Sequence, residues 1–329
     1  MKRFLFLICS LPFFSLQGQI FINEICPANA DINYDPDFYN FSCWIELYNG
    51  GNSNVTLDGY YLSDNTNNKG KWRIPNGTII QSKGYQLIWC DEMNTKMHTN
   101  FKLDSEGEEL ILSNPTLTQV DQIVFPKQYT NVSYGRKTDG ASSWSFHVEP
   151  TPGKINSNNT ATVQLETPSF SLSAGRYPST QSITIKHSIP SVEILYTTDG
   201  SEPTINSTKY VSPISIPKTT TLKAISYLKS FIPSKTEVKT YFINEHEFTL
   251  PVISLSTGPS FLTNSTIGIY VEGSNGIKGN CKDIPVNWNQ DWSRHAAFEF
   301  FKETGKKEFD QDVDIRIGGG CSRNNPKKS

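Results

Sequence analysis

Trp44-Ile45-Glu46-Leu47-Tyr48, followed directly by Asn49-Gly50-Gly51, is the stretch that decides the fold class: a short run of strand-forming residues that ends at a turn signal. The same unit recurs through the first half of the chain, with strand-like runs at 21–25, 59–62, 85–89, 109–112 and 122–125, and turn signals at 75–77, 105–107 and 138–140. We expect the glycines of these turns to take the positive φ that tight turns require. Short strands at regular intervals predict an antiparallel β-sandwich.

The composition also favours a mainly β protein. Only 19% of the 329 residues are charged and 36% are hydrophobic, so Asn, Ser and Thr carry much of the polarity, and these residues favour turns. The 30 basic and 32 acidic residues leave a net charge of −2. We therefore expect no nucleic-acid partner, because such binding needs a strongly basic surface. The length allows two or three domains with separate cores.

Residues 1–19 have the pattern of a signal peptide. Lys2 and Arg3 precede an apolar run at 4–16, which is shorter than the ~20 residues of a membrane span, and Gly18 is a small residue suited to cleavage. We expect a secreted or cell-surface protein with no transmembrane segment after the signal is removed. A lipid anchor on Cys9 is disfavoured, because Cys9 lies inside the apolar run and no small residues precede it.

Five cysteines would remain after cleavage: Cys26, Cys43, Cys90, Cys281 and Cys321. Their long, irregular spacings exclude a C-x-x-C redox pair and a four-cysteine zinc site. An oxidising compartment would permit disulfides, but an odd number leaves at least one thiol unpaired in a monomer. We favour buried free cysteines, and the sequence gives no pairing.

A series of motifs spans residues 20–155 in a fixed order. They are Ile22-Asn23-Glu24-Ile25, Trp44-Ile45-Glu46-Leu47-Tyr48-Asn49, Leu57-Asp58-Gly59-Tyr60-Tyr61-Leu62-Ser63-Asp64, Trp72-Arg73-Ile74-Pro75, Phe101-Lys102-Leu103, Ser133-Tyr134-Gly135-Arg136 and Pro150-Thr151-Pro152-Gly153. With these motifs the segment resembles the lamin tail domain, an immunoglobulin-like sandwich of nuclear lamins and many exported bacterial proteins. The resemblance implies an interaction module without enzymatic activity.

One stretch of this segment places oxygen-bearing side chains at alternate positions, as at the start of a calcium loop: Asp31, Asn33, Asp35 and Asp37. Two positions depart from that pattern, because Pro36 stands where the loop needs glycine and Ser42 where it needs a bidentate glutamate. Glu24 or Glu46 could close a different metal site. The alternative, which we favour, is a solvated acidic loop.

A polar run at 156–163 has the composition of a linker, and a second β pattern follows it. Its marker is Leu195-Tyr196-Thr197-Thr198-Asp199-Gly200-Ser201-Glu202-Pro203-Thr204, with Tyr210, Leu222-Lys223-Ala224 and Ser234. Residues 164–245 are thereby similar to the chitobiase/β-hexosaminidase C-terminal-type domain, a small β-sandwich that accompanies exported bacterial enzymes. This resemblance implies an accessory module. We expect Asp199 and Glu202 to have structural roles in a hairpin turn, since a glycosidase needs two carboxylates across a bond.

The sequence changes character at about residue 246. Gly268-Ile269-Tyr270-Val271, the runs 292–301 and 313–320, Ser322-Arg323 and Pro326-Lys327-Lys328-Ser329 occur in the order expected of the CotH kinase family. Residues 246–329 resemble the N-terminal part of that domain from about 248 onward. The family has an atypical protein-kinase-like fold and phosphorylates Ser/Thr side chains with ATP. We expect a domain truncated before its acidic loops, with neither catalysis nor a cofactor in this fragment.

The expected fold class is therefore mainly β: tandem immunoglobulin-like β-sandwiches followed by a partial α+β kinase-like small-lobe segment. Four basic residues near a triple glycine, 318–320, are candidates for nucleotide-phosphate contacts in a complete domain: Arg316, Arg323, Lys327 and Lys328. ATP and a divalent metal would be cofactors of that complete parent only. The alternative is a strand-to-loop turn with solvated lysines. The glycines do not form a Walker A loop, because glycine does not directly precede a Lys-Ser pair.

Three hypotheses of function follow. The first is an exported, non-catalytic protein whose sandwiches serve protein or cell-envelope interaction and scaffold the CotH-type domain. The second is the N-terminal portion of a secreted CotH-type protein Ser/Thr kinase. The third is a carbohydrate-binding protein with exposed Trp72, Trp89 and Trp144, although tryptophans in sandwiches usually lie in the core.

Overall fold

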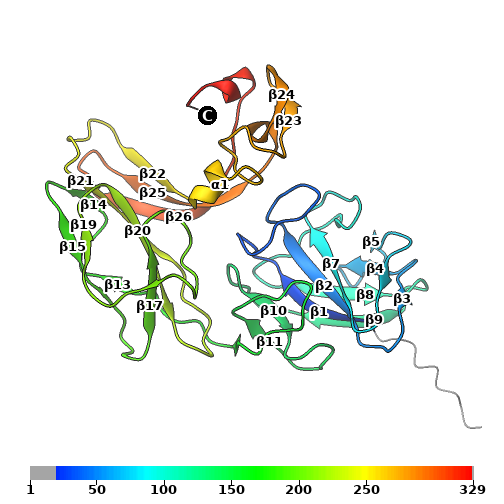
Figure 1. Ribbon diagram of the computed structural model, residues 1–329. Coiled ribbons are helices and arrows are strands. Elements are labelled where there is room, and N and C mark those ends of the chain that lie inside the picture. The colour runs from blue at the N-terminus through cyan, green and yellow to red at the C-terminus, as the bar shows by residue number, and fades with distance from the viewer. Residues whose placement is uncertain (1–19, 328–329) are drawn as a thin grey trace, which may run out of the picture.

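The computed structural model describes residues 20–327, so the predicted signal peptide and Lys328 lie outside it. The prediction of a mainly β protein is confirmed. The described chain has one α-helix, α1 (Pro259–Thr263), and two 3-10 turns, η1 (Asn287–Asn289) and η2 (Cys321–Asn324). Figure 1 shows two β-rich bodies side by side and a third part above them.

The first body packs two main sheets against each other. Its six-stranded sheet has the order β12-β11-β10-β1-β2-β7, with β1 (Ile20–Cys26), β2 (Cys43–Asn49), β7 (Tyr85–Cys90), β10 (Ser133–Arg136), β11 (Trp144–His147) and β12 (Thr160–Ala161). Its four-stranded sheet has the order β5-β4-β8-β9, with β4 (Tyr61–Ser63), β5 (Trp72–Arg73), β8 (Glu109–Ser113) and β9 (Gln119–Val124). A small pair joins β3 (Val55–Thr56) and β6 (Ile79–Ile80).

The stretch quoted first in the sequence forms β2, at the centre of the six-stranded sheet. From Trp44 to Asn49 every residue of β2 is buried, and the strand pairs with β1 on one side and β7 on the other. Ile45 and Leu47 belong to the cluster that also holds Leu62 and Leu110 of the facing sheet. This shared core is what makes the body a sandwich.

The predicted turn glycines are confirmed at three of four places, because Gly77, Gly107 and Gly140 have positive φ. The turn after β2 differs, since neither Gly50 nor Gly51 is among the positive-φ residues. There the Asn49 side chain accepts a hydrogen bond from the Gly51 amide at 2.9 Å. At Gly50 a Cβ would lie 2.9 Å from the edge of the Phe21 ring, so a larger residue would require this ring to shift.

The second body has a five-stranded sheet of order β14-β21-β20-β17-β18. Its strands are β14 (Gly175–Tyr177), β17 (Glu193–Thr197), β18 (Thr208–Lys209), β20 (Thr220–Tyr227) and β21 (Glu237–Ile243). Two small strand pairs accompany this sheet: β13 (Ser169–Phe170) with β16 (Ile185–Lys186), and β15 (Gln181–Ile183) with β19 (Ile214–Ile216). Ile183, Leu222 and Tyr241 lie in its buried core. Gly200, in the predicted tight turn after β17, has a φ of +91°.

The predicted linker at 156–163 is built into the first body. Thr160–Ala161 is strand β12, which pairs with β11. Asn156 is buried, and its side-chain amide donates to the carbonyl oxygen of Arg136 at 2.5 Å. The polar composition of this run therefore reflects hydrogen bonds to the sheet edge rather than an extended connector.

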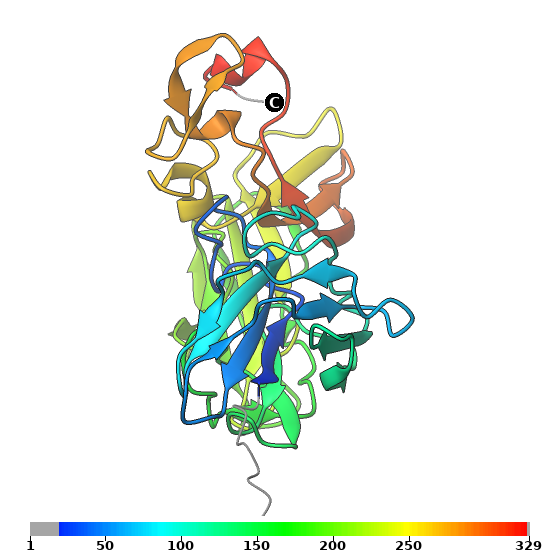
Figure 2. The ribbon, with the colours of Figure 1, turned by 90° about the vertical axis from the view of Figure 1, so that its right-hand side faces the viewer.

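The third part is a small antiparallel sheet with irregular loops. The sheet order is β22-β25-β26, with β22 (Val252–Ser256), β25 (Arg294–Phe301) and β26 (Lys307–Ile315). A hairpin of β23 (Ile277–Gly279) and β24 (Lys282–Val286) lies beyond it with α1, η1 and η2, toward the C-terminal end in Figures 1 and 2. The helix expected in this part is thus limited to five residues.

Two predictions about side chains are corrected. Four of the five cysteines predicted as free form disulfides, Cys43–Cys90 and Cys281–Cys321, each with a Cα–Cα distance of 5.1 Å, and Cys26 is the buried free cysteine. Cys43 and Cys90 can pair because strand pairing places them directly opposite each other, and only the folded sheet reveals this register.

The aromatic surface proposed for carbohydrate is also absent at two of its three positions. Trp72 is 4% exposed and Trp89 is 5% exposed, because both side chains pack in cores of the first body. Trp144 is partly exposed, but its ring stacks on Tyr134 at 5.5 Å and lies 5.0 Å from the guanidinium of Arg136.

Candidate functional site

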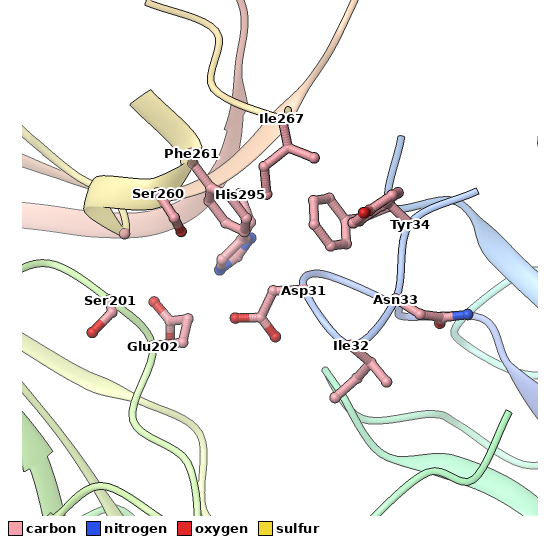
Figure 3. A pocket seen from close by; sticks show the side chains of 12 residues that line it. Asp31, Ile32, Asn33, Tyr34, Ser201, Glu202, Ser260, Phe261, Ile267 and His295 are labelled. Atoms are coloured by element: carbon pink, nitrogen blue, oxygen red, sulfur yellow. The ribbon is translucent and has the colours of Figure 1, made fainter. Parts of the chain in front are cut away.

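All three parts of the chain meet at a pocket of about 440 Å³. The loop after β1 contributes Asp31 and Tyr34, the turn after β17 contributes Glu202, and the third part contributes Phe261 and His295. In Figure 3 a carboxylate oxygen of Asp31 faces the side chain of Glu202, with the imidazole of His295 above them. We call this place the junction pocket.

Asp31 is held by a neighbouring loop of the same body. The Asn131 side-chain amide donates to its carboxylate at 2.7 Å, and the Asn131 side-chain oxygen accepts a hydrogen bond from the Asp31 amide at 3.1 Å. Burial, and then the negative charge of Glu202, raise the pKa of Asp31. The charge of Glu202 therefore disfavours the ionised form of Asp31 across the pocket.

Glu202 reaches the junction pocket as half of a buried ion pair. It accepts a hydrogen bond from the ammonium of Lys223, whose side chain is 1% exposed, and a second from the Thr236 hydroxyl at 2.8 Å. Lys223 also donates to the carbonyl oxygen of Ser256 in β22 at 3.3 Å. This pair ties the second body to the third part, so Glu202 has a structural role through an ion pair rather than within the hairpin turn. Asp199 accepts from the Ser201 amide within the turn.

His295 lies at the centre of a wider cleft. A second pocket of about 510 Å³ shares Asp31, Ile32, Glu202 and His295 with the junction pocket, and a third of about 440 Å³ shares Phe41 and His295. The imidazole Nε2 of His295 is 3.9 Å from a carboxylate oxygen of Asp312. We call the three pockets together the cleft: all three have His295 in their lining and lie where parts of the chain meet, among carboxylates and aromatic rings.

The predicted calcium residues have protein partners in the structure. Asp35 is buried and accepts hydrogen bonds from the amides of Asp37 and Asn40 at 3.0 and 2.9 Å, so its oxygens cap the local turn. A hydrogen bond from Lys96 lowers the pKa of Asp37. Asn33 accepts from Asn29 through its backbone carbonyl. Within residues 20–327, no three His, Cys, Asp or Glu side chains are arranged to hold a metal ion.

The predicted phosphate contacts also have other partners. Arg316 pairs with the exposed Asp291 at 3.1 Å. Arg323 donates to the carbonyl oxygens of Gly319 and Trp288 at 2.6 and 3.1 Å, which holds η2 against η1. Lys327 is exposed. Arg316 and Arg323 therefore have protein partners here, and their predicted contact with a nucleotide phosphate in a complete domain stays a prediction.

Sequence reasoning missed the roles of two buried glutamates. Glu24 in β1 and Glu46 in β2 are fully buried and stand opposite each other in the strand register. Burial, and then the charge of Glu24, raise the pKa of Glu46 to about 8. Their oxygens accept hydrogen bonds from the amides of Thr151 and Gly153, so they hold the Pro150-Thr151-Pro152-Gly153 loop. A glutamate inside an otherwise apolar strand was the available signal.

Comparisons with known proteins agree with two of the predicted modules. Residues 15–127 match the Lamin Tail Domain family. Residues 172–245 match the family of the Chitobiase/beta-hexosaminidase C-terminal domain. The first match ends before β10, β11 and β12, although these strands complete the same sheet. No curated protein matches the chain.

Among solved structures, the crystal structure of the ICAM-5 D1-D4 ectodomain fragment is similar at 9% identity, with 88% of this chain and 76% of that chain covered. Its TM-score of 0.18 is too low to carry an argument. In the described part of the chain, no helix has the length and apolar character needed to cross a membrane.

Proposed function

We propose that this protein is an exported, non-catalytic scaffold, secreted or displayed at the cell surface. In this proposal the two β-sandwiches hold the third part in a fixed position and bind a protein or envelope partner through the cleft between them. The family matches of the two bodies support an interaction role, since loops of β-sandwiches are common binding surfaces.

The docking of the third part on both bodies is the observation that carries the proposal. The Trp292 indole donates to the carbonyl oxygen of Phe38, and Arg294 donates to that of Tyr39 at 3.0 Å. On the other side, the Thr240 amide donates to the buried carboxylate of Glu299 at 3.2 Å. Bonds to both sandwiches hold the third part in one orientation, which is what a scaffold must achieve.

The cleft can be tested with a photo-crosslinking residue placed in the full natural chain in the producing cell. We expect a protein adduct from Ile32, which lines two of the pockets, and none from Val211, which is 83% exposed and lines none of them. Equal labelling from both positions, or none from Ile32, would contradict a partner in the cleft. Phosphate transfer from ATP by residues 20–329 alone would contradict the proposal that the protein is non-catalytic.

The second candidate function is the N-terminal portion of a secreted CotH-type protein Ser/Thr kinase. It rests on the resemblance of residues 248–329 and on the antiparallel sheet β22-β25-β26, which is compatible with a small-lobe sheet. Genomic sequence past Ser329 distinguishes the two candidates. Acidic loops for metal binding would favour the kinase, and a stop codon would favour the scaffold.

A further inference from the structure

The sheet β22-β25-β26 has one covered face and one open face. On the covered face, Phe301 packs edge-to-face on Phe242 of the second body with a centroid distance of 5.0 Å. On the open face, Ile253 and Leu255 are each 55% exposed and Phe309 is 49% exposed. Figure 1 shows the sheet lying across the end of the second body.

The open face carries a continuous apolar ladder. The strand register places Ile253 beside Phe300 and Leu255 beside Phe298. The Phe309 ring of β26 stacks on Phe298 and Phe300 with centroid distances of 5.7 and 5.5 Å. A patch of this kind on a protein surface marks an interaction site more often than isolated apolar residues do.

Beside this ladder, β26 is a free edge. Among the described strands it pairs only with β25, although it is nine residues long. Its sequence alternates between the two faces: Phe309, Gln311 and Val313 lie on the ladder side, and Asp310, Asp312 and Asp314 on the other. Long unprotected edges are where a further strand can add.

The negative charges along β26 determine which kind of strand can pair with this edge. In an antiparallel pairing of β26 with a second copy of itself, aspartates would lie beside aspartates, which is unfavourable. The Asp312 carboxylate is 69% exposed, and the imidazole Nε2 of His295 lies 3.9 Å from it. Lys307 neutralises Asp310 in part, at 3.0 Å. A strand with basic side chains on one face complements this row.

We propose that β26 binds an extended segment of a partner protein whose residues alternate between basic and apolar. The segment adds to the sheet through backbone hydrogen bonds. Its apolar side chains extend the ladder beside Phe309 and Val313, and its Lys or Arg side chains lie beside Asp310 and Asp312. Asp312 also lines the second pocket and Asp314 the third, so this site borders the cleft. The crosslinking test at Ile32 addresses the proposed function independently of peptide binding to β26.

The test uses residues 20–329 and a fluorescent peptide of about eleven residues in which Lys and Val alternate, long enough to cover β26. Binding is followed by anisotropy and by hydrogen exchange of the β26 amides. We expect saturable binding and slower exchange in β26. Asp312→Lys should weaken binding about tenfold or more, as should Phe309→Ser, whereas Asp283→Lys, a charge reversal in the β23-β24 hairpin, should not.

Three control results would overturn the proposal. A peptide with the same composition but the lysines in one block must bind more weakly, since equal binding would indicate charge attraction alone. A peptide with N-methyl groups on alternate amides must not bind, because it cannot form the backbone hydrogen bonds to β26. Protection of the β26 edge amides without peptide, or a dimer that dissociates on Asp312→Lys, would show that another segment or a second copy already occupies the edge.

Discussion

Glu46 shows how one residue can couple folding to pH. Its carboxyl group is fully buried under the Pro150-Thr151-Pro152-Gly153 loop, on the face of the sheet opposite Ile45 and Leu47. Asn23 donates to one oxygen at 3.1 Å and Gly153 to the other at 2.6 Å. The folded protein favours the protonated form, because burial and the neighbouring Glu24 raise the pKa of Glu46 from 4.5 to about 8. Burial also raises the pKa of Glu24.

We predict that stability falls as the pH rises from 5 to 8.5. A raised pKa in the folded state contributes stability that is full below about 4.5 and is lost by about 8, because the unfolded chain releases the proton first. The loss should be on the order of a few kcal/mol. Urea unfolding at several pH values in this range gives the free energy of unfolding as a function of pH. Its fall with rising pH should be less steep for Glu46→Gln than for the wild type. Glu106→Gln, which removes an exposed carboxylate of the same body, should leave the pH dependence of the free energy of unfolding as in the wild type.

At the scale of elements, a disulfide covalently links the paired strands β2 and β7. Trp44 stands opposite Trp89 and Cys43 opposite Cys90 in this register, and the disulfide spans 47 residues of sequence. A cross-link of that span stabilises mainly by restricting the unfolded chain. The junction pocket begins a short distance beyond this strand end, in the loop between β1 and β2.

We predict that Cys43→Ser/Cys90→Ser lowers the free energy of unfolding by about 2–4 kcal/mol. Thiol titration of unfolded, unreduced residues 20–329 should find Cys26 alone, and reduction should release the remaining four cysteines. Cys26→Ala is the matched control, which should abolish the titratable thiol without breaking a cross-link. A titration that finds Cys43 free would contradict the pairing.

At the scale of the whole molecule, Arg294 joins the third part to the first body. Its side chain is 1% exposed and lies over the ring of Trp292 with its guanidinium carbon 4.9 Å from the centroid. It donates to the carbonyl oxygens of Ile267 and Tyr39 at 2.9 and 3.0 Å. Burial lowers the pKa of Arg294 to about 10, and the group remains charged at neutral pH. Removing it would leave buried carbonyls without donors.

We predict that Arg294→Ala weakens docking of the third part by on the order of 3 kcal/mol. Limited proteolysis should then cut after residue 246 about 100-fold faster, with the two sandwiches still resistant. Arg316→Ala, which removes an exposed arginine from the same part, should leave the cleavage rate unchanged. Equal cleavage rates in the two variants would show that Arg294 does not hold the parts together.

Much of the fold could be predicted from the sequence because strands and tight turns are local. The run at β2 and the glycines at 77, 107 and 140 needed only neighbouring residues to specify their conformation. The candidate site could not be predicted in this way. Asp31 and Glu202 were singled out for other reasons, and His295 was not assigned a role, since no local pattern reports that these three residues meet.

The sequence by itself determined the alternation of strands and turns, the two sandwich modules and the acidic alternation along β26. Only the tertiary structure decided which cysteines pair, that the polar run at 156–163 joins a sheet, and that Trp292 binds the carbonyl of Phe38 across 254 residues. The physical reason is the distance along the chain over which each kind of interaction acts. Backbone preferences act over a few residues, whereas contacts between modules depend on how whole faces pack, which no short segment encodes.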